Sequence, residues 1–260
     1  MPRTAFVLVA IALVVGLGAP SWAQTASLTV AAASDLQAVF PQLASRFERE
    51  TGIKVTVSFG SSGNVFAQIQ NGAPFDLFFS ADIDYPRRLG MSGHADAASL
   101  YEYATGRIVL WTRKNSGIDV KKGLAVLEDP KVRRIAIANP TVAPYGRAAV
   151  AAMKSAKVYD AVRGKIVQGD NISQTAQLVD SGNADVGILA HSLALGPALS
   201  ASGTYFEIPT SAHPPIEQAA VIVSASKNKA AGRRFLEYVK GADAQATLQR
   251  FGFVTAVATR

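Results

Sequence analysis

The sequence predicts an α/β fold with largely parallel sheets. Apolar runs of strand length alternate with helix-like segments along almost the whole chain of 260 residues, a pattern typical of consecutive βα units. No tandem repeat, low-complexity tract or long linker divides the chain. The expected strands are 28–32, 55–59, 76–79, 108–112, 135–138, 165–168, 186–189 and 220–223.

Two of these apolar runs, 108–112 and 220–223, lie where the chain could pass between two lobes. If both are crossings, one domain is assembled from the two ends of the chain and the other from its middle. A ligand would then bind in the cleft between them.

The helix-like segment after the first strand has apolar residues at helical spacing from Leu36 to Phe47. Pro41 interrupts it, so we expect its first turn to be separate or kinked. Gly52 is expected to end this helix. Shorter helices are expected between 62 and 72, over 147–154, and from 171 to about 179, with another around 235–239.

The first residues are typical of a secretory signal peptide. Arg3 precedes an apolar run over 5–17, and Ser21 and Ala23 are small residues at the two positions that a signal peptidase reads. We expect 1–23 to be removed and the mature protein to be periplasmic. A membrane anchor is the weaker interpretation, because the apolar run is short for a bilayer span.

Composition excludes several classes of site. The chain has no cysteine, so disulfides, thiolate metal sites, cysteine nucleophiles and a lipid-modified cysteine are excluded. The formal charge of +7 comes from scattered lysines and arginines rather than a long basic run with interleaved aromatics. We therefore expect no nucleic-acid partner.

Two donor-rich elbows, 31–35 and 59–64, each follow an expected strand and open an expected helix. A helix start presents unpaired backbone N–H groups and a partial positive charge, and the hydroxyls of Ser34 and Ser62 add donors for an oxyanion. The alternative interpretations are structural. Ser34 with Gln37 fits a capping box, and the second elbow fits an ordinary serine-rich turn.

Two further elbows, 139–146 and 169–172, have the same form. Pro144 suits a first helical turn, which would leave the Tyr145 N–H among the unpaired donors. Asn171 could cap the next helix while the Ile172 N–H points outward. A packed tyrosine and a plain cap are the alternatives.

Several motifs in order resemble the periplasmic molybdate-binding proteins of ABC importers. They are Leu28 to Ser34, Phe59 to Gly63, Gly72 to Asp82, Asn139 to Tyr145, Ala184 to Ile188 and Gly241 to Phe253. The resemblance covers essentially the whole mature chain. It implies a two-lobed, type II periplasmic binding protein fold, with a mixed, mostly parallel sheet flanked by helices in each lobe. The lobes would be 24–106 plus 214–260, and 107–213, joined by two crossings.

The resemblance also implies a function. The chain would be the receptor that captures molybdate or tungstate for an inner-membrane ABC permease, without enzymatic activity, without a cofactor and as a monomer. Carried over by motif, Ser34 and Ser62 would bind the anion from one lobe, and the backbone amides of Tyr145 and Ile172 from the other. Further candidates are Ser61, Asn171, Ala190 and His191. No residue is expected to ligate a metal cation directly.

One departure from the family concerns a tyrosine that often supplies a fifth contact. The corresponding residues of this chain are Leu189-Ala190-His191, so the hydroxyl that would make this contact is missing. The phenol of Tyr145 is a candidate replacement. His191 is a weaker one, and it is more typical of a surface or capping residue.

A socket of donors alone would reject hydrogenphosphate, whose own proton would meet another donor. Sulfate passes that test, so a receptor for sulfate or another tetrahedral oxyanion is the alternative. A secreted serine hydrolase is a remote one, because Gly60-Ser61-Ser62-Gly63 lacks the spacing of a nucleophile elbow. The three histidines show no metal-ligand spacing, and no P-loop occurs.

Overall fold

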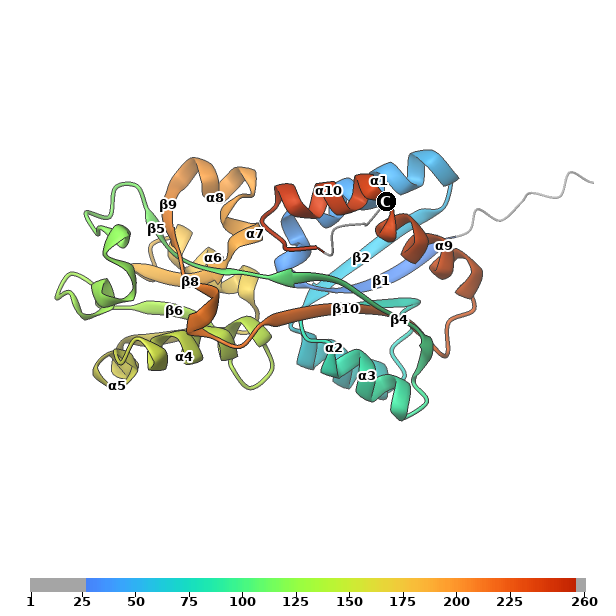
Figure 1. Ribbon diagram of the computed structural model, residues 1–260, viewed down its shortest axis with the longest axis horizontal. Coiled ribbons are helices and arrows are strands. Elements are labelled where there is room, and N and C mark those ends of the chain that lie inside the picture. The colour runs from blue at the N-terminus through green and yellow to red at the C-terminus, as the bar shows by residue number, and fades with distance from the viewer. Residues whose placement is uncertain (1–26, 256–260) are drawn as a thin grey trace, which may run out of the picture.

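The computed structural model describes residues 27–255, which form two α/β lobes side by side (Figure 1). The predicted signal peptide, 1–23, lies outside the described residues. Within them, no helix is both long and apolar enough to cross a membrane.

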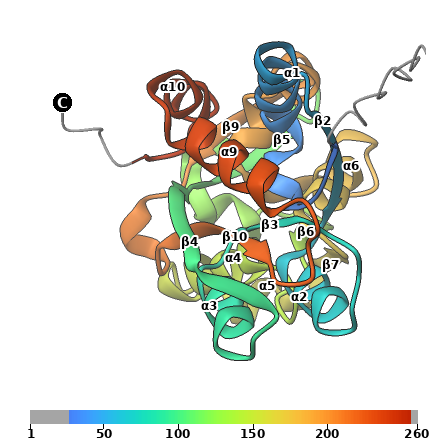
Figure 2. The ribbon, with the colours of Figure 1, turned by 90° about the vertical axis from the view of Figure 1, so that its right-hand side faces the viewer.

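The first lobe is built on a sheet with the strand order β2-β1-β3-β10-β4. The strands β1, β2 and β3 are parallel, whereas β10 runs antiparallel to β3 and β4. The strands are β1 (Ser27–Ala33), β2 (Lys54–Gly60), β3 (Leu77–Ser80), β4 (Ala95–Gly106) and β10 (Ile216–Val223). Helices cover both faces of this sheet, as the view in Figure 2 shows. One face is covered by α1 (Phe40–Thr51), α9 (Lys229–Lys240) and α10 (Ala242–Arg250). The other face is covered by α2 (Ser62–Gln70) and α3 (Asp84–Met91).

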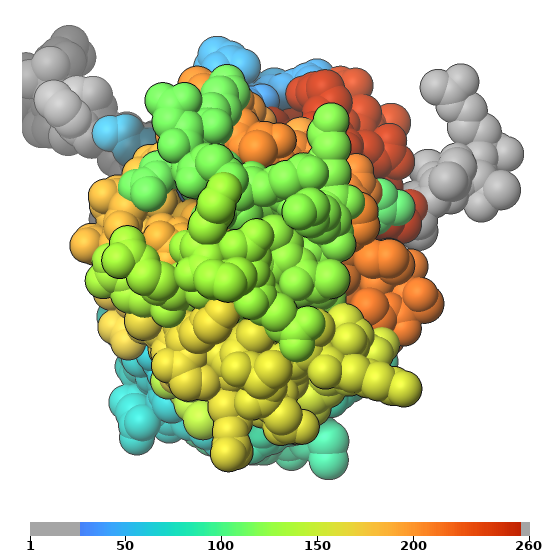
Figure 3. Space-filling view, turned by 90° about the vertical axis from the view of Figure 1, so that its left-hand side faces the viewer, coloured from blue at the N-terminus to red at the C-terminus, as the bar shows by residue number. Residues whose placement is uncertain are grey.

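The second lobe repeats this pattern with the strand order β7-β6-β8-β5-β9. Here β6 is parallel to β7 and β8, and β5 is antiparallel to β8 and β9. The strands are β5 (Ile108–Arg113), β6 (Ile135–Ala138), β7 (Ile166–Gly169), β8 (Val186–Ala190) and β9 (Gly203–Glu207). The α-helices are α4 (Pro144–Ser155), α5 (Tyr159–Val162), α6 (Ile172–Asp180), α7 (His191–Ala194) and α8 (Pro197–Ser202). The 3₁₀ segments within the described residues are η1 (Ser34–Ala38), η2 (Val120–Glu128), η3 (Arg163–Lys165) and η4 (Thr210–Ala212). Figure 3 shows the surface of the second lobe, at the end that faces away from the first lobe.

The chain passes between the lobes twice. Only Arg107 separates β4 from β5, and residues 213–215 lead from η4 into β10, so the fourth strand of each sheet enters from the other lobe (Figure 1). The two crossings therefore lie just before the apolar runs 108–112 and 220–223. The runs themselves are paired inside the sheets.

The predicted α/β class with mixed, mostly parallel sheets is confirmed, and all eight expected strands are present. Sequence analysis missed β4 and β9. Both are edge strands whose residues are mostly half-buried or exposed, so neither shows the continuous apolar run of the central strands. The predicted break at Pro41 is also confirmed, because η1 ends at Ala38 and α1 begins at Phe40.

An aromatic cluster forms the core of the first lobe between its sheet and α1 and α9. The ring of Phe235 lies 4.9 Å from Phe47, 5.7 Å from Phe40 and 5.8 Å from Phe79, measured between centroids. All four rings are buried. Phe235 therefore connects α9, near the end of the chain, to elements from the start of the chain, which makes the discontinuous lobe one packed unit.

We expect Phe235→Ala to lower the free energy of unfolding by about 3–5 kcal/mol, because it leaves a cavity among three rings. Denaturant unfolding measures this loss. Met91→Ala is the matched control, since Met91 is 88% exposed and surface changes usually stay within about 0.5 kcal/mol. Equal effects of the two variants would contradict the proposed role of the cluster.

Candidate ligand-binding site

Four helix starts follow the C-terminal ends of parallel strands. The segment η1 follows β1, and α2 follows β2, while α4 and α6 follow β6 and β7 in the second lobe. The first N–H groups of a helix have no partner within it, so each start carries a partial positive charge. Since the C-terminal ends of parallel strands share one edge of a sheet, each lobe places two such starts together.

Hydrogen bonds across the cleft join both helix starts of the first lobe to α4 and α7 of the second. The Gly63 N–H of α2 donates to the Val142 carbonyl in the loop before α4, at 2.9 Å. The Tyr145 phenol of α4 donates to Asp35 Oδ2 in η1, also at 2.9 Å. The Ser192 hydroxyl of α7 donates to the Asp35 carbonyl at 2.7 Å. The structure is therefore a closed arrangement of the lobes.

Serine hydroxyls lie at both helix starts of the first lobe. The Ser62 Oγ accepts a hydrogen bond of 2.9 Å from the Ala81 N–H, which leaves the hydroxyl proton available to a ligand. The Ser61 Oγ is buried without a partner among the described residues. Ser34 is 3% exposed, and its hydroxyl has no hydrogen-bond partner in the described part of the chain.

The predicted capping box at Ser34 is wrong. The residue that caps η1 is Ala33, and no side-chain capping bond forms. Ser34 is already the first residue of the 3₁₀ segment, so its hydroxyl is not in the position of a cap. The side chain of Gln37 lines a cavity between the lobes instead.

In the second lobe, the predicted cap and first turn are confirmed. The Asn171 Oδ1 accepts from the Ser173 and Gln174 N–H groups at 3.1 and 3.0 Å. These bonds leave the Ile172 N–H, at the first position of α6, outside the cap. Pro144 begins α4, so the Tyr145 N–H is at the second position.

The Tyr145 phenol belongs to a buried network. Asp35 Oδ2 accepts from this phenol and, at 2.8 Å, from the Gln218 side-chain amide of β10. The Tyr103 phenol of β4 donates to the side-chain Oε1 of Gln218 at 2.7 Å. Burial raises the pKa of Asp35 to about 6, against the opposing effect of the bonds from Gln218 and Tyr145.

Sequence analysis missed Asp35 and Gln218 as parts of the site. The available signal for Asp35 was a carboxylate directly after Ser34 in a donor-rich elbow, which was interpreted as part of a cap. Gln218 had no signal, because its strand shows only that an apolar segment is buried.

His191 is buried rather than on the surface, so that part of the prediction is wrong. Its Nε2 lies 3.3 Å from the Tyr205 hydroxyl of β9, and its Nδ1 faces Gly252, where an added Cβ would lie 2.6 Å away. Desolvation lowers the pKa of His191. Neither His191 nor Ala190, which ends β8, hydrogen-bonds to the serine elbows.

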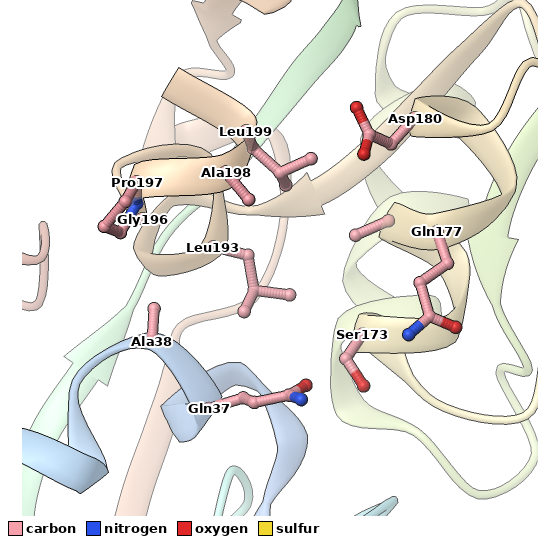
Figure 4. A pocket seen from close by; sticks show the side chains of 11 residues that line it. Gln37, Ala38, Ser173, Gln177, Asp180, Leu193, Gly196, Pro197, Ala198 and Leu199 are labelled. Atoms are coloured by element: carbon pink, nitrogen blue, oxygen red, sulfur yellow. The ribbon is translucent and has the colours of Figure 1, made fainter. Parts of the chain in front are cut away.

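Two cavities flank the helix starts. One of about 250 Å³ lies between η1 and the helices α6 to α8, with Gln37 on one side and Ser173 on the other (Figure 4). A second, of about 290 Å³, lies beside the ion pair that joins Arg147 of α4 to Asp82. Within residues 27–255, no three His, Asp or Glu side chains cluster as a metal site.

Comparison with known proteins agrees with this architecture. The chain is 38% identical over 244 residues to the molybdate-binding protein ModA of Azotobacter vinelandii, covering 93% of this chain and 96% of that relative. It is 35% identical over 246 residues to ModA of Rhodobacter capsulatus, covering 95% and 94%.

Among solved structures, the A. vinelandii periplasmic molybdate-binding protein matches with a TM-score of 0.82 and 35% identity, over 88% of this chain and 99% of that one. The family described as bacterial extracellular solute-binding protein matches residues 28–254. The chain therefore belongs to this family of solute-binding proteins.

Proposed function

We propose that this protein captures molybdate or tungstate in the cleft and presents it to an inner-membrane ABC permease, as a periplasmic monomer that is not an enzyme and binds no nucleic acid. The observation that carries the proposal is that two helix starts from each lobe face the cleft, and that both starts in the first lobe carry serine hydroxyls. The ligands would be the Ser34 and Ser62 hydroxyls and the Tyr145 and Ile172 amides. The similarity to molybdate-binding relatives supports this choice of anion.

Neutral donors suit a dianion that must be held firmly and released. A buried countercharge would lose its hydration, and that cost would offset much of its attraction. Fixed backbone and hydroxyl dipoles stabilise the anion without this cost. The nearby cation at the cleft, Arg147, is already paired with Asp82.

The two lobes, residues 24–106 with 214–260 and residues 107–213, are proposed to move as rigid bodies when the cleft opens and closes. Both crossings would act as the hinge, because the backbone there is the only covalent connection between the two sheets. Binding would favour the closed form through contacts that only this form completes.

Contacts of the histidines favour binding over hydrolysis. His94 lies 3.0 Å from the Ser92 hydroxyl, His191 contacts Tyr205, and His213 contacts the Pro214 carbonyl. None of these rings hydrogen-bonds to Ser61 or Ser62. A serine nucleophile would need such a base.

Anion titration tests the proposal. Ligand that binds only the folded state stabilises it by about 2.7 kcal/mol at one hundred times its dissociation constant. Molybdate and tungstate should raise the melting temperature strongly, sulfate weakly and phosphate hardly at all. A larger shift with sulfate would point to a sulfate receptor, and no shift with any of these anions would contradict the proposal.

We expect Ser34→Ala to weaken molybdate binding about ten- to a hundred-fold, because one hydrogen bond to a charged group is lost. Its effect on the melting temperature without ligand should be small, since its hydroxyl has no partner to lose. Calorimetric titration and thermal unfolding measure the two effects.

The matched variants separate binding from folding. Ser62→Ala should weaken binding similarly and also lower stability by about 1–3 kcal/mol, because the Ala81 N–H loses its acceptor. Ser200→Ala, at an exposed position on α8, should change neither quantity. If Ser34→Ala destabilises the protein without weakening binding, Ser34 has only a structural role.

Gly63→Ala should weaken molybdate binding about ten- to a hundred-fold by obstructing closure. An added Cβ would lie 2.8 Å from the Val142 carbonyl across the cleft and 2.9 Å from the Tyr85 hydroxyl, and such overpacking costs about 1–3 kcal/mol. Gly164→Ala is the control, since nothing lies within 4 Å of its added Cβ. Unchanged affinity of Gly63→Ala, measured by the same titration, would show that binding does not need this approach of the lobes.

A further inference from the structure

The Asp35 carboxyl lies next to the proposed anion ligand Ser34 and also joins the two lobes. We propose that Asp35 is a proton-linked latch, which is a neutral carboxylic acid when the lobes close on the anion. Capture of one dianion then takes up a proton from solvent, which adds to the carboxylate and forms the O–H bond of the acid. This inference rests on the proposed function.

The hydrogen bonds to Asp35 fit the neutral acid. Both donors, the Tyr145 phenol and the Gln218 amide, bind the same oxygen, Oδ2. The other oxygen, Oδ1, is buried and has no hydrogen-bond partner among the described residues. In the acid, Oδ2 is the carbonyl oxygen that accepts two bonds and Oδ1 carries the proton. In the carboxylate, Oδ1 would be a buried anionic oxygen with no hydrogen-bond partner among the described residues. The backbone N–H groups of Asp35 and Leu36 favour the carboxylate, but their effect on the pKa is smaller than that of burial.

Among residues 27–255, no charged side chain forms an ion pair with Asp35. The titratable groups that face it are the phenols of Tyr145 on α4 and Tyr103 on β4. The other charged or titratable side chains on the elements packed around it make no hydrogen bond to it. They are Arg147 and Lys154 on α4, Glu217 on β10, Asp96, Tyr101 and Glu102 on β4, His191 on α7, Asp180 on α6, Arg46, Glu48, Arg49 and Glu50 on α1, and Lys54 on β2.

Protonation of Asp35 is coupled to anion binding because both residues that join the lobes here, Asp35 and Tyr145, are adjacent to or part of the proposed ligand set. Asp35 directly follows Ser34, and the Tyr145 phenol that donates to it belongs to a residue whose backbone amide is a proposed ligand of the anion. Opening the lobes would break the bonds from Tyr145 and Ser192 and expose the carboxyl to water. A dianion beside the closed carboxyl adds repulsion, which further disfavours the carboxylate.

The sign of the pH dependence follows. Burial in the closed form raises the pKa of Asp35 to about 6 from the ordinary 3.8, and the bound dianion raises it further. The open form binds fewer protons because water stabilises its carboxylate. The closed, liganded form therefore holds more protons, so molybdate affinity should fall as pH rises through the pKa of the liganded form and level off above it.

Calorimetric titration of the full protein with dilute molybdate at pH 5.5, between the ordinary pKa of 3.8 and the closed-form value of about 6, tests the latch. In buffers with different ionisation enthalpies, the dependence of the observed heat on buffer gives the protons exchanged on binding. We expect uptake of roughly half to one proton per anion, and none for Asp35→Asn, which keeps the shape of the side chain without the titration. Asp180→Asn, which changes a carboxylate that bonds to Ser202 outside the network, should keep the uptake of the unmodified protein.

The outcomes separate the latch from the proposed function. Binding of molybdate without proton uptake overturns the latch alone, and the absence of any binding overturns both. Uptake that persists in Asp35→Asn assigns the proton to another group and also overturns the latch. If Asp35→Asn does not fold, infrared difference spectra of the unmodified protein decide the matter. A carbonyl band of a neutral carboxyl must then appear on adding molybdate, and its absence would contradict the proposal.

Discussion

The hydrogen bond between the Tyr145 phenol and the Asp35 carboxyl is the contact on which the cleft depends. It joins the start of α4 to the start of η1. The segment η1 follows β1 directly, and α4 follows β6 after the loop 139–143. One bond therefore fixes the relative position of donors from both lobes. The crossing strand permits it, because at Gly106 a side chain would meet the Tyr145 hydroxyl and the Gln218 amide. Closure is thus built on close packing around the Asp35 carboxyl, which receives the bond from Tyr145 only when the lobes meet.

In this cleft, the groups proposed to bind the anion differ from the group whose charge is proposed to change when the anion binds. Backbone N–H groups and serine hydroxyls supply fixed dipoles whose number does not change with pH in the physiological range. The carboxyl of Asp35 is the variable element, since its charge responds both to burial and to the anion beside it. The proposed receptor could therefore couple capture to closure without placing a lysine or arginine against the ligand.

Much of the fold followed from the sequence because its determinants are local. Central strands are short apolar runs, Pro41 interrupts a helical pattern, and Asn171 caps α6 as its position predicts. The edge strands β4 and β9 were missed because half-exposed strands lack such runs. The four elbows could be predicted, whereas the role of Asp35 could not, because its partners Tyr145 and Gln218 lie 110 and 183 residues away. Only the tertiary structure shows that this carboxyl has no cation near it.

Anomalous diffraction from crystals grown with tungstate tests whether the anion binds between the helix starts. We expect one strong tungsten peak in the cleft, within hydrogen-bond reach of the Ser34 and Ser62 hydroxyls and the backbone amides of Tyr145 and Ile172. No lysine or arginine side chain should contact the anion. A peak instead at a basic surface, such as the groove lined by Arg46, Arg49 and Arg250, with no density between the helix starts, would contradict this expectation.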